Sequence, residues 1–138
     1  VVHAAGGLAG IHVCSNTDWG LILETAVDIV NFDTYSYFDR FLLYGGQVKQ
    51  FIARGGMLAW GLVPTGSAEA LEAATRDSLV RRWEGQCNDL VALGVDREQL
   101  LAQSLISPSC GVGSLSLAQA QKVLALTRDV SAYIREQR

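Results

Sequence analysis

The chain has little charge and no excess of basic residues. Only 18% of its 138 residues are charged, and the net charge is −3. Domains that bind nucleic acid carry clusters of Lys and Arg, so this composition argues against a nucleic-acid partner. Long apolar runs are also missing, because the longest nearly uncharged stretch, residues 1–17, is interrupted by His3 and several glycines. We therefore expect neither a membrane span nor a signal peptide.

Cysteine is scarce as well, and its number is odd. The three cysteines show no spacing typical of a disulfide framework, which predicts free thiols in a cytoplasmic, reducing compartment. The chain does not start with Met, and 49% of its residues are hydrophobic. We expect it to be a piece of a longer protein whose remainder covers part of this apolar surface.

Short apolar strands alternate with helical segments along the whole chain. Strands of this kind are typical of a parallel sheet covered by helices, so residues 1–138 predict one α/β domain. With right-handed crossovers the order gives either half of a (β/α)8 barrel, which is a TIM-barrel-type fold, or part of a doubly wound sheet. The predicted strands are 11–14, 27–33, 57–63 and 104–107, and the predicted helices are 19–26, 37–54, 68–93 and 118–138, with a short turn at 97–103.

The first strand is not followed by the glycine-rich loop that binds phosphates. Residues 15–17 read Ser-Asn-Thr instead, which argues against a nucleotide site. In both candidate folds the functional groups lie at the carboxyl ends of the strands. The predicted ends carry Cys14, Asp33, Pro64 with Thr65, and Cys110. We therefore expect the turns after the first and fourth strands to meet.

His12, Cys14 and Cys110 together suit a zinc ion. His12 and Cys14 are two residues apart on a strand and so share a face. Catalytic zinc is held by three protein ligands and keeps one position open, where a substrate thiol becomes nucleophilic near neutral pH. Asp33 is a fourth ligand, a partner that orients His12, or a cap of the next helix. The alternative is that the cysteines only pack in a core, as free cysteines commonly do.

Four segments resemble one known superfamily. Residues 11–19, 27–33, 58–65 and 108–113 occur in the order expected for the uroporphyrinogen decarboxylase/cobalamin-independent methionine synthase superfamily. They are most similar to its methionine-synthase-like and corrinoid-methyltransferase-like branch. The resemblance implies a TIM barrel, of which this chain would be the last four βα units.

This resemblance also implies ligands and reactants. The zinc-dependent methyltransferases of the group bind metal through a His-x-Cys pair and a cysteine after the last strand, positions that match His12, Cys14 and Cys110. Asp33 stands where methionine synthase has a Glu ligand. The implied reaction is methyl transfer to a small thiol from a folate or a methylated corrinoid. We expect Asn16 and Trp60 to line the substrate pocket.

Two other interpretations stay open. The chain is alternatively a non-catalytic half-barrel that binds a partner and holds a structural metal or none, or a decarboxylase-like enzyme that needs no metal. A four-stranded half-barrel would expose two strand edges, and exposed edges invite pairing. We therefore expect self-association or pairing with a missing N-terminal half.

Overall fold

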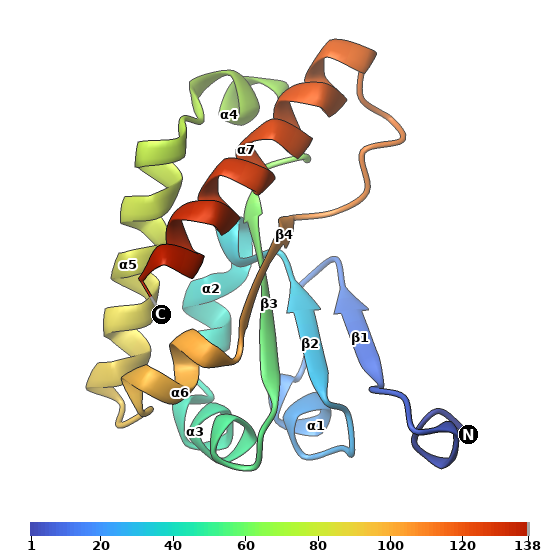
Figure 1. Ribbon diagram of the computed structural model, residues 1–138, viewed down its shortest axis with the longest axis vertical. Coiled ribbons are helices and arrows are strands. Elements are labelled where there is room, and N and C mark those ends of the chain that lie inside the picture. The colour runs from blue at the N-terminus through green and yellow to red at the C-terminus, as the bar shows by residue number, and fades with distance from the viewer. Residues whose placement is uncertain (138) are drawn as a thin grey trace.

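A four-stranded parallel sheet organises the chain. The computed structural model describes residues 1–137, in which the strands follow one another across the sheet in the order β1-β2-β3-β4 (Figure 1). All three neighbouring pairs are parallel, which confirms the predicted α/β class. The strands are β1 (Gly10–Val13), β2 (Ile29–Phe32), β3 (Met57–Val63) and β4 (Ser104–Pro108).

Two of the predicted helices are each broken into two. A single helix over residues 37–54 is wrong, because the chain forms α2 (Thr34–Leu42) and α3 (Gly45–Ala53). The first starts early because the Asp33 side chain accepts a hydrogen bond from the Ser36 N–H and so caps it. The remaining helices are η1 (His3–Ala5), α1 (Trp19–Leu23), α4 (Ala68–Ala73), α5 (Arg76–Ala92), α6 (Arg97–Ala102) and α7 (Leu117–Glu136).

The break between α4 and α5 has a local cause. Thr75 accepts a hydrogen bond from the Ser78 N–H, while the Ser78 hydroxyl accepts one from the Thr75 N–H. This capping box starts a new helix inside the predicted segment 68–93. None of the helices in residues 1–137 combines the length and the hydropathy that crossing a bilayer requires.

The helices gather against one face of the sheet and bury its apolar side chains (Figure 1). Val30, Phe32, Leu58 and Trp60 alternate along β2 and β3 on this face, and each is at most 1% exposed. The Phe32 ring packs against the Trp19 ring of α1, with the centroids 4.7 Å apart. The core therefore lies between the sheet and the helices.

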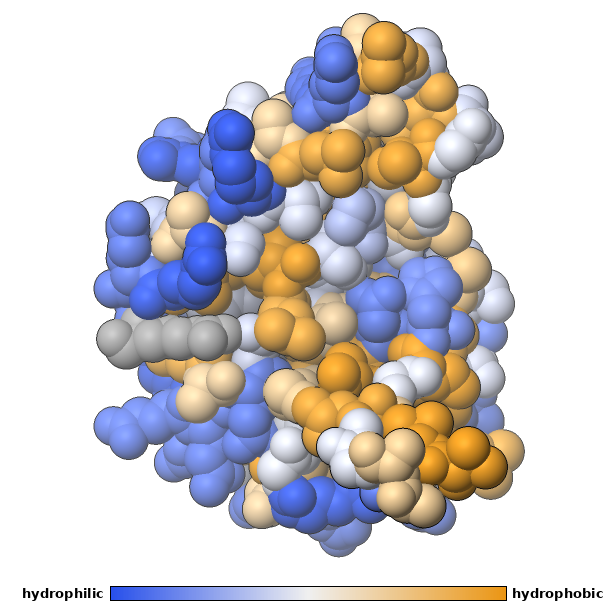
Figure 2. Space-filling view, turned by 45° about the vertical axis from the view of Figure 1, so that its right-hand side comes forward, coloured by the Kyte–Doolittle hydropathy of each residue, from blue (hydrophilic) through white to orange (hydrophobic). Residues whose placement is uncertain are grey.

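The opposite face of the sheet is open in the part of the chain that the structure describes. His12 is exposed on it, Asn31 beside it is half-buried, and Leu105 at the other end of the same row is 45% exposed. Figure 2 turns the right-hand side of Figure 1 forward and shows hydrophobic residues at the surface, most densely in its lower part. Both polar and apolar side chains thus face outward here.

Candidate metal site

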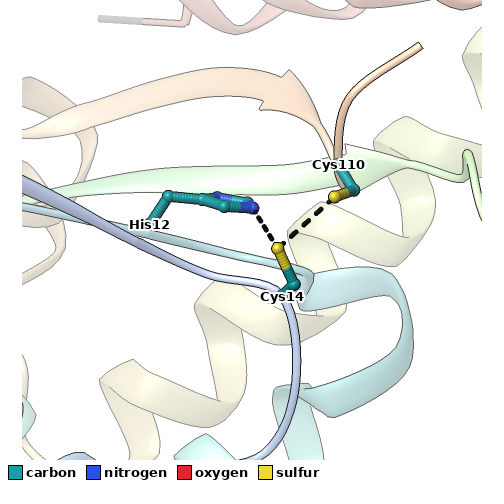
Figure 3. A group of neighbouring side chains, drawn as sticks. All are labelled: His12, Cys14 and Cys110. Carbon is teal, nitrogen blue, oxygen red and sulfur yellow. Dashed lines mark hydrogen bonds between the residues drawn. The ribbon is translucent and has the colours of Figure 1, made fainter. Parts of the chain in front are cut away.

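Three potential metal ligands meet at the carboxyl end of the sheet. The ligand atoms of His12, Cys14 and Cys110 all lie within 4.8 Å of one another. His12 Nε2 is 3.0 Å from Cys14 Sγ, which is 3.5 Å from Cys110 Sγ. Figure 3 shows the imidazole and both thiols pointing toward a common centre. The predicted meeting of the two turns is therefore confirmed.

The first two ligands come from the end of β1. His12 lies within the strand and Cys14 directly follows it, so their side chains leave the same side of the chain. Asp18 then caps α1 by accepting hydrogen bonds from the N–H groups of Gly20 and Leu21. The strand and the cap fix both ends of the short loop that carries Cys14.

Cys110, the third potential ligand, is positioned by Ser109, the residue before it. Ser109 is 2% exposed, and its N–H donates to the carbonyl oxygen of Val63 at the end of β3. Its hydroxyl oxygen accepts a hydrogen bond from the Thr65 N–H at 3.0 Å. These bonds anchor the turn after β4 to the end of β3, and Cys110 projects from that anchor toward β1.

Gly61 permits this close approach. A Cβ atom at this position would collide with the carbonyl oxygen of Phe32 and would lie 3.0 Å from the Cα of Ser109. The register between β3 and β4 also shifts at this point, between Gly61 and Val63. The missing side chain therefore lets the Cys110 turn fold down over the sheet.

Asn31 links the imidazole to the middle of the sheet. Its Oδ1 lies 2.6 Å from His12 Nδ1, and its Nδ2 donates to the Ala59 carbonyl oxygen and to Ser107 Oγ, each at 2.8 Å. Together with His12, these residues come from all four strands, and they lie on the open face of the sheet near the two thiols. Asn31 and Ser107 were not among the predicted site residues, although both lie on strands of the sheet that carries the site.

The two thiols of the site differ in acidity. The pKa of Cys110 is lowered, first by its interaction with His12 and then by its hydrogen bonds with Cys14 and with the N–H of Gly111. The pKa of Cys14 is raised, chiefly because its thiol proton is held in the hydrogen bond to Cys110. Cys110 is therefore the group that ionises first.

The donor set fits a tetrahedral metal ion. Zinc bonds of about 2.3 Å to sulfur and about 2.0 Å to nitrogen separate two sulfurs by about 3.7 Å and a sulfur from a nitrogen by about 3.5 Å. The observed separations, 3.5 Å and 3.0 Å, are each within about 0.5 Å of these values. Both cysteines are free thiols. Small side-chain rotations would therefore complete three corners of a tetrahedron.

A pocket adjoins the two sulfurs. It has a volume of about 350 Å³, within the usual range for small-ligand sites. The strand ends that the sequence pointed to, Cys14, Asp33, Pro64 with Thr65, and Cys110, all line it. Several residues that carry a hydroxyl group also line it: Tyr35, Ser36, Tyr37, Ser67 and Ser109.

Asp33 lies at this pocket but outside the group of three ligands. Its Oδ1 accepts a hydrogen bond from the Ser36 N–H at 2.9 Å, so it caps α2, which was one of its predicted roles. The expectation that it orients His12 is wrong, because Asn31 makes that contact. Asn16, predicted to line the pocket, is exposed in the loop after Cys14 and is not part of the pocket wall.

Trp60 is also not in the pocket. It lies on the helix-covered face of β3, is fully buried, and donates its indole N–H to Ser104 Oγ at 2.9 Å. The prediction rested only on the position of Trp60 near the end of a strand. It did not determine which face of the sheet the side chain lies on. Cys87 packs in the core on α5, and burial raises its pKa to about 12.

Comparisons with family models, with curated proteins and with solved structures found no match to this chain. The family resemblance therefore stays a prediction.

Proposed function

We propose that this chain is a zinc-binding, methyltransferase-like half-barrel that activates a small thiol for methyl transfer. The observation that carries the proposal is the convergence of His12, Cys14 and Cys110 at the carboxyl end of a parallel sheet. Two thiolates and a neutral imidazole would leave a Zn²⁺ complex without net charge. When bound, zinc acts as a Lewis acid that keeps a substrate thiol deprotonated near neutral pH.

The substrate thiol would enter from the pocket. Cys14 and Cys110 line it, whereas His12 does not, so the pocket lies on the cysteine side of the three proposed ligands. The hydroxyl groups and the Asp33 carboxyl group in its wall offer hydrogen bonds to the remainder of the substrate. Methyl transfer then forms a bond between the substrate sulfur and the methyl carbon. The bond between the methyl carbon and the folate nitrogen or corrinoid cobalt breaks, and its electron pair stays with the donor.

The sheet topology supports the half-barrel part of the proposal. Sequential parallel strands with their helices on one face are the arrangement of a (β/α) barrel, whereas a doubly wound sheet reverses its strand order and carries helices on both faces. The open face of the sheet would be the barrel interior. A further four βα units, from a missing N-terminal half or from another copy of this chain, would cover it.

Cobalt substitution tests the thiol-activation proposal without requiring a complete barrel. Co²⁺ bound by cysteine gives near-ultraviolet charge-transfer bands, and tetrahedral Co²⁺ absorbs strongly in the visible. We expect both signals in the wild type, stronger charge transfer on addition of 2-mercaptoethanol, and loss of both in Cys110→Ser. A wild-type protein that gives no thiolate-to-cobalt band contradicts the proposal.

The second candidate function is a non-catalytic interaction module. The exposed edge of β1 and the open face favour it, because unpaired strand edges bind other strands. In this case the chain would bind no cobalt, or it would bind cobalt at a structural site whose spectrum added thiols leave unchanged. Both candidates predict an assembly larger than one chain, and light scattering that finds a stable monomer contradicts that shared expectation. A decarboxylase-like enzyme, the remaining interpretation, predicts no bound metal.

A further inference from the structure

We infer that Asn31 is a positioning residue that holds His12 in the tautomer protonated on Nδ1 and so aims the lone pair of Nε2 at the two cysteine sulfurs. The inference rests on the proposed function only for the identity of the bound metal. Its evidence is a chain of hydrogen bonds that runs from β3 and β4 through Asn31 on β2 to His12 on β1.

The hydrogen-bond partners of Asn31 determine the orientation of its side-chain amide. One end of the amide faces the Ala59 carbonyl oxygen at 2.8 Å, and a backbone carbonyl can only accept a hydrogen bond. The end that faces Ala59 must therefore be the NH2 group. The same nitrogen has a second proton for Ser107 Oγ, so both of its donors are used. Oδ1 is the end that faces His12.

The Asn31 side-chain oxygen determines which nitrogen of the His12 imidazole carries the proton. Asn31 Oδ1 is an acceptor without a proton, and it lies 2.6 Å from His12 Nδ1, so Nδ1 must carry the hydrogen. A neutral imidazole has one N–H group, which leaves Nε2 with a free lone pair. Nε2 is the nitrogen that lies 3.0 Å from Cys14 Sγ. The amide thus decides which nitrogen is available as a ligand.

The register of the sheet places Asn31 directly beside His12. His12 pairs with Asn31, and Asn31 pairs with Ala59, so the three residues form one row across β1, β2 and β3. A parallel sheet places such neighbours on the same face. Ser107 reaches the same amide from β4, three residues before Cys110. The two strands that supply the ligands are therefore connected through Asn31.

The expected effect concerns metal affinity rather than folding alone. Residues that hold a metal-binding histidine in the right tautomer typically contribute 10- to 100-fold to affinity. Asn31→Leu removes the acceptor and the two donors, so we expect a zinc dissociation constant raised about 10- to 100-fold, with about one zinc per chain still bound at saturation. Asn31→Asp keeps an acceptor oxygen for Nδ1 and should retain most of the affinity, even if it unfolds more easily. Competition with a chromophoric chelator measures these constants.

A second readout needs no metal. The background is the full chain with Cys14→Ser and Cys110→Ser, which removes both thiols from the neighbourhood of the imidazole. At about pH 8, above the ordinary imidazole pKa, long-range ¹H–¹⁵N correlation spectra of ¹⁵N-histidine-labelled protein identify the tautomer. His3, the other histidine, is assigned from a His3→Gln variant. We expect Nδ1–H for His12, retained with Asn31→Asp and replaced by Nε2–H with Asn31→Leu.

The outcomes separate the two proposals. Nε2–H in the chain with native Asn31 overturns the inference, as does Nδ1–H that persists in the Asn31→Leu variant. Should Asn31→Leu not fold, the spectrum with native Asn31 decides alone. A wild-type chain that shows the expected tautomer but binds neither zinc nor cobalt contradicts the proposed function and leaves the positioning role of Asn31 intact.

Discussion

The sulfur of Cys14 lies 3.5 Å from the sulfur of Cys110, although the two residues are 96 positions apart in the chain. One thiol follows the first strand of the sheet and the other follows the fourth. The strands are not neighbours in the sheet, so the contact depends on how the turn after β4 crosses the end of β3.

Mild oxidation should join the two sulfurs. Diamide, which accepts the two electrons and two protons that a pair of thiols gives up, is expected to form an intramolecular Cys14–Cys110 disulfide in the metal-free protein. Zinc added beforehand should protect both thiols, since its ligands are deprotonated and occupied. Peptide mass spectrometry under non-reducing conditions identifies the bond. Buried Cys87 serves as the internal control and should stay a free thiol. Disulfides that form only between chains would contradict the observed proximity.

The two exposed thiols should differ in reactivity toward iodoacetamide in the metal-free protein. Because the pKa of Cys110 is lowered and that of Cys14 is raised, Cys110 holds the larger thiolate fraction at neutral pH and should react first. The difference should shrink as the pH rises above the ordinary thiol pKa of about 8.5, where both thiols ionise. His12→Gln should slow the reaction of Cys110, since the interaction with His12 is the largest cause of its lowered pKa. Equal rates at neutral pH would contradict this order.

Gly61→Ala should destabilise the fold and weaken the site together. The added methyl group would meet the Phe32 carbonyl oxygen and the backbone of Ser109, which forces the end of β4 away from β3. Overpacking of this kind typically costs about 1–3 kcal/mol. Gly85→Ala is the matched control, because Gly85 is exposed within α5 with open space around its Cβ position. In that control we expect a gain of about 0.5–1 kcal/mol in the free energy of unfolding. Urea titrations measure both changes, and two variants of equal stability would argue against the close approach at Gly61.

The strands and their functional ends were predictable because the pattern there is strong. The segment 57–63 is a continuous apolar run, and it forms β3 with the same bounds. Parallel strands place their carboxyl ends together, so the sequence alone predicts that Cys14 and Cys110 meet. Both predictions follow from general properties of parallel sheets: their strands are apolar, and their carboxyl ends lie at the same edge.

The remaining features depend on contacts that no sequence pattern reports. The helix predicted over 37–54 breaks before Gly45, which is buried against the Leu93 side chain at the end of α5. Trp60 was misplaced because its face on β3 follows from the register with β2, where it pairs with Phe32. Asn31 was overlooked because its role arises only from cross-strand neighbours.

The central claim is that the two turns form one metal site, and zinc stoichiometry tests it most directly. The wild-type chain, Cys110→Ser and Cys87→Ser would be purified without chelators and measured by elemental analysis. We predict about one zinc per chain in the wild type and in Cys87→Ser, and a sharp loss in Cys110→Ser. No zinc in the wild type, or an equal content in all three proteins, would contradict the account.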